Sequence, residues 1–148
     1  MIKPNYDPDF FYHWHKLTIR FSDVDALQHV NNAVFNTYYE ESRLRFLGEY
    51  FQMNKEYHEG RSFVMVRSEI EYLGQIKFPD TILIGTGISK VGNSNLDAFQ
   101  GIYNAESKKL LSVAKTTGVW FDVKNQKPVR LPKIKDLDAM MLKSESNG

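Results

Sequence analysis

A single helical pattern, placed between one strand pattern and four others, limits the folds that are open to this chain. Residues 32–50 repeat apolar and aromatic side chains at helical spacing, and Asn31 and Asn32 open the run. Asparagine is a strong helix N-cap because its side-chain oxygen accepts an otherwise unpaired backbone N–H. The sequence therefore predicts a helix from about Asn32 to Tyr50. One face of that helix carries Phe35, Tyr38, Tyr39, Ser42 and Phe46.

Alternation of apolar and polar residues predicts strands on both sides of this helix. The first strand begins at His13 and places Leu17, Ile19 and Phe21 on one face. Four more strands follow Gly60, with turn signals such as Pro79-Asp80 between them. Their shared faces carry Val64, Val66, Ile70 and Tyr72, then Ile82, Ile84 and Ile88, then Leu96, Ala98, Gln100 and Ile102, then Leu111, Val113, Val119 and Phe121. Short connections favour antiparallel pairing, so we expect an α+β layer of one long helix on about five strands.

Length and composition narrow the class of protein further. A chain of 148 residues suits one domain, which we place at 13–142 between an irregular lead-in (1–12) and a disordered tail (143–148). The net charge of +1 offers no global field to attract nucleic acid or an anionic membrane. The absence of cysteine excludes disulfides and thiolate nucleophiles. No apolar run is long enough for a signal peptide or a membrane span, so we expect a cytoplasmic protein.

The densest group of reactive side chains joins the first strand to the helix. It contains the carboxylates of Asp23 and Asp25, the imidazole of His29 and the amides of Asn31 and Asn32. A helix N-terminus exposes backbone N–H groups, which favour a nearby anion and polarise a carbonyl oxygen. A carboxylate held there stays ionised, as a general base or a direct nucleophile must.

Two other interpretations of the same residues remain open. An Asp-x-Asp sequence before a helix also serves as ordinary turn and capping chemistry. Asp23, Asp25 and His29 would offer oxygen and nitrogen ligands to a divalent metal, but no further ligand cluster supports them. We therefore expect no metal.

The stretch RFSDVDALQHVNNAVFNTYYEESR resembles the signature of the 4-hydroxybenzoyl-CoA thioesterase-like family, which has the hotdog fold. The similarity continues through YLGQIKFPDTILI, VGNSNLDAFQGIY and VWFDVKNQKPVRLP, and so covers most of residues 13–132. The first motif is fairly specific, and the later ones support it. The resemblance implies a long central helix wrapped by a curved antiparallel sheet.

The resemblance also assigns roles to individual residues. The second Asp of the motif is the catalytic carboxylate in that family, which implies this role for Asp25. The backbone from Val30 to Asn32 would polarise the thioester carbonyl, with Asn31 and Asn32 lining the site. Gln28 stands where the motif usually has glycine, so the loop is expected to change shape or to bring Gln28 itself to the substrate.

Further substrate contacts are implied at His29 and in the turn 92–95. His29 would bond a carboxylate or fix the loop, and we favour the second role. Asn93 and Ser94 would approach the pantetheine arm or the acyl chain. Glu41 is an alternative helix-borne carboxylate, which we rank below Asp25.

Together these residues predict an acyl-CoA or acyl-ACP thioesterase that needs no cofactor, the coenzyme A thioester being its substrate. The family's active site lies at a dimer interface, so we expect a homodimer or homotetramer. The alternatives are a hotdog hydratase or dehydratase using Asp25 and His29, a non-catalytic acyl-thioester binding module, and a structural dimerisation domain. The acyl group, and the choice between CoA and a carrier protein, are not encoded in any motif.

Overall fold

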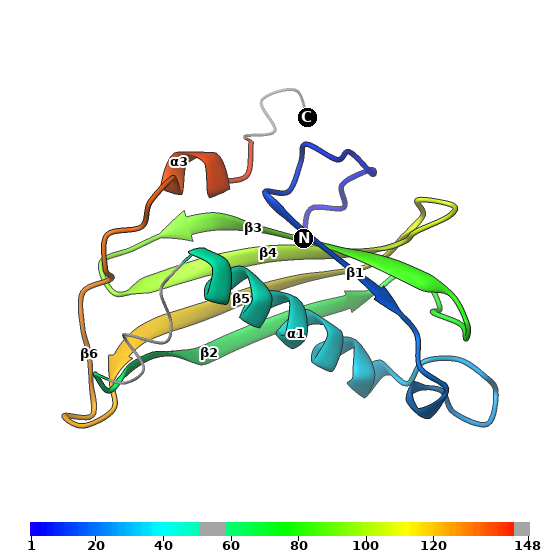
Figure 1. The fold of residues 1–148 in the computed structure, drawn as a ribbon, viewed down its shortest axis with the longest axis horizontal. Coiled ribbons are helices and arrows are strands. Elements are labelled where there is room, and N and C mark those ends of the chain that lie inside the picture. Colours follow the sequence, from blue (N-terminus) through cyan, green and yellow to red (C-terminus); the bar gives the residue numbers. More distant parts are fainter. Residues whose placement is uncertain (51–58, 144–148) are drawn as a thin grey trace.

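One long helix lies across a curved antiparallel sheet (Figure 1). The computed structural model describes residues 1–50 and 59–143. The elements in chain order are β1 (His13–Thr18), the 3-10 helix η1 (Phe21–Asp23), α1 (Asn32–Tyr50), β2 (Arg61–Tyr72), β3 (Thr81–Val91), β4 (Asn95–Asn104), β5 (Leu110–Asp122), β6 (Lys127–Pro128) and α3 (Leu137–Met140). The predicted bounds of the long helix and the α+β class are confirmed. Of the predicted disordered tail (143–148), residues 144–148 lie outside the described residues.

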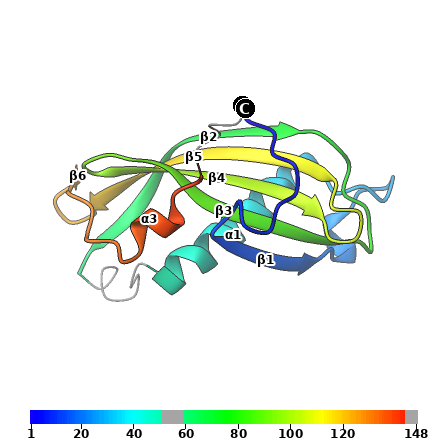
Figure 2. The ribbon, with the colours of Figure 1, turned by 90° about the horizontal axis from the view of Figure 1, so that it is seen from above.

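The sheet has six strands in the order β1-β3-β4-β5-β2, and the two-residue β6 pairs with β5. Every pairing is antiparallel. β1 and β2 are therefore the edge strands, on opposite sides of the sheet. Figure 2 shows the curvature of the sheet, with α1 along one side of it.

The core lies between α1 and the strands that it covers. Phe35, Tyr38 and Tyr39 of the helix pack against Ile82, Ile84 and Ile102 of the sheet. All of these side chains are buried, as are Ser42 and Phe46 of the predicted helix face. Burying apolar surface of this extent is the dominant favourable contribution to folding.

The opposite face of the sheet is covered by the first residues of the chain. Residues 1–12 contain no helix or strand, yet Phe11 is buried against Phe99 and Val113. A Cβ added at Gly85 would lie 2.2 Å from the Phe11 ring. Glycine at this position therefore lets the lead-in lie directly on β3.

Two predicted strand faces are wrong in detail. Phe21 lies in η1 rather than in β1, and its side chain is 76% exposed. Val64 and Val66 are exposed, as is Met65 between them, so this part of the edge strand β2 is uncovered on both faces. The pairing of β2 with β5 also shifts register between Met65 and Arg67, so Val64 and Ile70 do not share a face as predicted. A bulge of this kind inserts one residue and breaks the alternation of faces.

Candidate active site

The loop that precedes α1 is a short hairpin built around Asp25. The Asp25 N–H donates to the His29 carbonyl oxygen over 3.0 Å, and the Gln28 N–H donates to the Asp25 carbonyl oxygen over 2.9 Å. Val24 and Val30 form an antiparallel bridge just outside this turn. A turn of three residues in which the last residue is left-handed is a common way to close such a hairpin.

Gln28 is that left-handed residue, with φ of 63°. The loop therefore has the backbone conformation that the motif's usual glycine adopts at no steric cost, and glutamine adopts it with strain. Gln28 is exposed. With glutamine in place of the motif's glycine, the turn around Asp25 thus keeps its hydrogen-bonded conformation.

The carboxylate of Asp25 has two different environments. Its Oδ1 accepts the backbone N–H of Leu27 over 2.9 Å and that of His29 over 3.3 Å. This is the turn chemistry that the sequence left open as an alternative. Within residues 1–50 and 59–143, no hydrogen bond engages Oδ2 of Asp25, and the residue is exposed. One oxygen thus fixes the loop while the other remains accessible.

Asp23, the first carboxylate of the motif, is buried and committed to structure. It accepts the Tyr38 hydroxyl over 2.8 Å and the Arg20 guanidinium over 3.2 Å. Burial alone would raise the pKa of Asp23, but the hydrogen bonds from Tyr38 and Arg20 outweigh it, so the pKa lies below its ordinary value. Burial, reinforced by Asp23, raises the pKa of Tyr38, which stays protonated as the donor. These contacts leave Asp25 as the accessible carboxylate of the pair.

The start of α1 lies beside Asp25. The Asn31 side-chain oxygen accepts the Ala33 N–H over 2.9 Å, which confirms the predicted N-cap. No acceptor for the N–H of Asn32 is present among the described residues. The first N–H groups of a helix lack intrahelical partners and carry its positive dipole end. This N–H is therefore available to a ligand oxygen.

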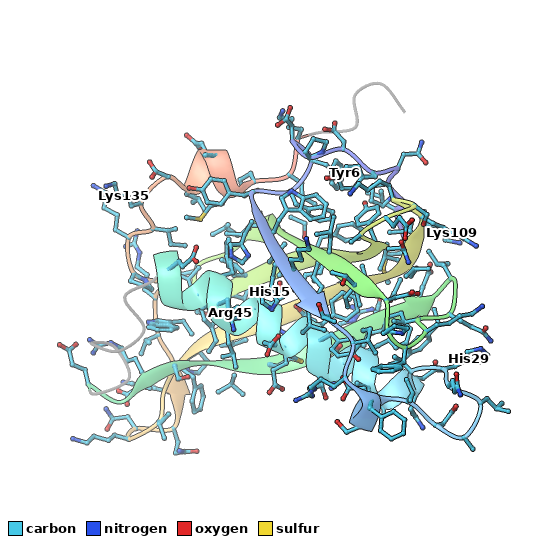
Figure 3. All side chains as sticks on the ribbon, turned by 45° about the vertical axis from the view of Figure 1, so that its right-hand side comes forward. Tyr6, His15, His29, Arg45, Lys109 and Lys135 are labelled. Atoms are coloured by element: carbon cyan, nitrogen blue, oxygen red, sulfur yellow. The ribbon has the colours of Figure 1, made fainter. Side chains whose placement is uncertain are left out.

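Asp25 and the start of α1 border the same cavity, which has a volume of about 370 Å³. It is lined by Asp25, Leu27, His29, Val30, Asn31, Asn32, Phe35, Gly74 and Gln75. Figure 3 shows His29 on the loop at one end of the molecule, far from Lys135 at the other. Five of the predicted site residues thus surround one cavity, and Gln28 lies in the same loop.

Gly74 and Gln75 were not predicted, because a long-range pairing brings them there. The Val30 N–H donates to the Ile76 carbonyl oxygen over 2.8 Å, and His29 forms a bridge with Lys77. The only signal in the sequence is that YLGQIK belongs to the family resemblance, and it gives no role to either residue.

Asn93 and Ser94 lie elsewhere in the chain's fold. They form the turn between β3 and β4, at the end of the sheet opposite to the loop between η1 and α1 (Figure 1). Asn93 lines a different cavity, of about 590 Å³, together with Arg130 and Lys133. A single chain therefore does not bring the turn 92–95 to Asp25.

A second pair of reactive side chains lies on β1 and α1. Nε2 of His15 is 2.8 Å from Oε2 of Glu41, and both line a polar cavity of about 270 Å³ with Arg20 and Arg45. Figure 3 shows His15 beside Arg45, midway along the helix. The residues that the structure describes include no group of three or more His, Asp or Glu placed to hold a metal ion.

A model of the thioesterase-like superfamily matches residues 19–141. The chain belongs to this superfamily. The resemblance on which the hotdog fold was predicted is thereby confirmed. Among the described helices, none combines the length and the apolar character needed to cross a bilayer.

Several relatives show how far the similarity extends. A thioesterase from Thermus thermophilus, solved with coenzyme A and Zn, is 28% identical, with a TM-score of 0.73 over 84% of this chain and 89% of that one. The probable thioesterase YbaW from Escherichia coli is 24% identical, with a TM-score of 0.75 over 88% and 98%. The chloroplastic acyl-acyl carrier protein thioesterase ATL2 from Arabidopsis thaliana is 25% identical over 82% of this chain. The present chain spans only 64% of the plant protein's length.

Proposed function

We propose that this protein hydrolyses acyl thioesters and that Asp25 is the catalytic carboxylate. The observation that carries the proposal is that the two carboxylate oxygens of Asp25 have different contacts. Oδ1 is held by two backbone N–H groups, and Oδ2 has no hydrogen bond within the described residues; Asp25 borders a cavity at a helix start. A side chain fixed by one oxygen presents the other in a constant position, which pre-organised catalysis requires.

The geometry supports a simple reaction. Oδ2 of Asp25 removes a proton from water as it attacks the thioester carbon, or attacks that carbon itself. The carbonyl oxygen gains negative charge and is stabilised by the N–H of Asn32 and the helix dipole. When water attacks, the C–S bond then breaks, the thiol leaves with the proton that Asp25 took up, and the acyl group leaves as a carboxylic acid. When Asp25 itself attacks, the C–S bond breaks to leave an acyl–Asp25 anhydride; water hydrolyses this anhydride to the carboxylic acid and the free carboxylate, and the thiolate takes the proton that this water releases. Every group in this sequence comes from the chain or from water, so no cofactor is required.

The substrate class is acyl-CoA or acyl-ACP. Coenzyme A is bound in the Thermus thermophilus relative, and the plant relative is named for acyl carrier protein. A fourth cavity, largely apolar and of about 240 Å³, lies between α1 and the sheet, with Leu44, Leu47, Phe63 and Leu96 in its walls. Its lining suits an acyl chain.

We further propose a homodimer formed through β2, with a homotetramer as the larger alternative. β2 is an edge strand, and Val64, Met65 and Val66 on it are exposed, as is Leu44 of α1. Exposed apolar edge strands readily pair with another chain. Two copies of β2 paired antiparallel would place the end of one strand beside the start of the other. The turn 92–95 of one copy would then lie on the same side as Asp25 of its partner.

Thiol release tests the proposal directly. Purified protein is offered acyl-CoAs of increasing chain length while a chromogenic thiol reagent reports hydrolysis. We expect turnover by the wild type and a loss of at least about 100-fold in Asp25→Asn, since general-base contributions are of this size or larger. No thiol from any substrate, or full activity in the variant, would refute the mechanism.

The hydratase or dehydratase alternative is favoured by one observation, the contact of His15 with Glu41. A His–Glu pair provides the acid and base that addition of water to a double bond needs. Enoyl-CoA is therefore included in the assay. Loss of the enoyl absorbance without thiol release, abolished by Glu41→Gln, would support this alternative over the thioesterase.

A further inference from the structure

The segment after β5 carries a run of positive charge, which begins after Asp122 and ends before Asp136 and Asp138. Residues 124–135, which we name the basic strap, include five Lys and Arg and no Asp or Glu: Lys124, Lys127, Arg130, Lys133 and Lys135. The net charge of the whole chain is only +1, so the rest of it is net acidic. All five cations are exposed. Among the residues that the structure describes, none of the five forms an ion pair.

The backbone of the basic strap is fixed to the rest of the fold. The Val129 N–H donates to the Trp120 carbonyl oxygen, and the Leu131 N–H donates to that of Asn93, each over 2.9 Å. Leu131 and Ile134 pack on the cluster around Phe46. The apolar residues thus turn inward between cations that remain in solvent, so the charges are displayed on an ordered support.

The shape of the basic strap indicates the size of its partner. It runs across the end of the sheet from the β5–β6 hairpin to α3 (Figure 1). Lys135 follows Lys127 by eight positions, a span of up to about 28 Å in extended chain. The phosphates of one nucleotide would meet only part of such a row, whereas carboxylates along a protein surface would meet all of it. Arg130 and Lys133 also border the cavity beside Asn93, so the surface is concave.

We propose that the basic strap docks an acidic carrier protein that delivers the acyl thioester. This inference rests on the proposed function, because it names the partner of the same site. Arg61, the first residue of β2, pairs with Asp122 next to the basic strap, and Tyr72, the last, precedes the Gly74 that lines the Asp25 cavity. In a dimer with antiparallel β2 strands, the basic strap of one copy lies toward the Asp25 cavity of the other.

The test compares carrier-borne and carrier-free substrates. An acidic acyl carrier protein loaded with octanoate, octanoyl-CoA and octanoyl-N-acetylcysteamine are hydrolysed by the wild type, by Lys127→Glu/Lys135→Glu and by Lys108→Glu/Lys109→Glu. The last pair changes the same charge in the β4–β5 hairpin, and Figure 3 shows Lys109 across the molecule from Lys135. We expect only Lys127→Glu/Lys135→Glu to lose about tenfold in kcat/KM for the carrier-borne substrate relative to octanoyl-N-acetylcysteamine. The loss should come from a higher KM, and kcat/KM of this variant should depend less on salt than that of the wild type.

Three outcomes would overturn the inference while the thioesterase proposal stands. These are equal losses in both charge variants, no loss in either, or a loss as large with octanoyl-CoA, which would assign the cations to nucleotide phosphates. Binding of the unloaded carrier protein is measured separately by titration calorimetry. If no thioester is cleaved but the carrier binds through the basic strap, the proposed function fails and the docking surface remains. Absence of that binding refutes the docking surface whatever the activity.

Discussion

At the scale of single residues, the two carboxylates of the motif differ in their burial and in how many of their oxygens are hydrogen-bonded. Asp23 is buried and bonded to Tyr38 and Arg20, whereas Asp25 uses one oxygen for its turn. Sequence spacing treats them alike, and only the family resemblance ranked Asp25 higher. The physical reason for the ranking lies in contacts with α1 that spacing does not reveal.

Two substitutions of Asp25 separate its structural contribution from its chemical one. Asparagine retains an oxygen that can accept the Leu27 N–H. The free energy of unfolding of Asp25→Asn is therefore expected to lie within about 0.5 kcal/mol of the wild-type value. Alanine removes that acceptor, so Asp25→Ala should lose about 1 kcal/mol. Both should lose hydrolysis. Urea titrations measure the stabilities, and an equal stability of all three proteins would show that the turn bond is unimportant.

Gln28 offers a second test at this scale. Its φ of 63° is strained for glutamine and free of strain for glycine, so Gln28→Gly should keep or raise the unfolding free energy, and Gln28→Val should lower it by more than about 1 kcal/mol. The same two substitutions at Gln126, which has φ of 54° in the β5–β6 hairpin, provide the matched control. If valine were tolerated equally at residue 28, the loop would be able to relax out of this conformation. Thermal and urea unfolding distinguish the cases.

At the scale of elements, the sequence predicted the helix and strand faces that follow a regular repeat. It did not predict the positions at which a bulge or a 3-10 helix interrupts the repeat. The helix 32–50 was predictable because its N-cap and its buried face both follow fixed spacing. The bulge in β2 displaced Val66, and η1 removed Phe21 from β1, since neither has a periodic signal. Gly74 and Gln75 reach the site through pairing of distant segments. The cavity was therefore predictable only on its helix side.

The bond between η1 and α1 should make stability depend on pH. The pKa of Asp23 is lower in the folded protein than its ordinary value, so the folded state favours the ionised form. This contribution is present above the unfolded pKa of about 3.9 and is lost as the pH falls through the folded value. Asp23→Asn should therefore cost about 2 kcal/mol at pH 7, and the difference from the wild type should shrink at pH 3.

The matched control for Asp23 is Asp9→Asn, which removes a negative charge at an exposed position. Urea unfolding at both pH values should show little effect of this change. A deficit of Asp23→Asn that stayed constant between pH 7 and pH 3 would mean that the carboxylate charge does not stabilise the contact with Tyr38.

At the scale of the whole molecule, one chain keeps two of the described features far apart. The Asp25 cavity and the basic strap lie at opposite ends of the sheet, and the edge strand between them exposes apolar residues. Eleven residues of β3 separate these ends, about 36 Å at strand spacing. A homodimer through β2 would bring unlike ends together, so activity should depend on association.

Val66→Lys tests that dependence. A lysine at this exposed edge position, where the side chain is 60% exposed in the single chain, should repel the same residue of a second copy and favour monomers. Sedimentation velocity should show a smaller species, and hydrolysis should fall together with the dimer fraction as the protein is diluted. Val123→Lys, on the β5–β6 hairpin and 50% exposed, adds the same charge beyond the first residue of β2, outside the proposed strand pairing, and should leave both unchanged. A fully active monomer of Val66→Lys would show that one chain holds the complete site, and the approach of the basic strap to a partner's Asp25 would then lose its basis.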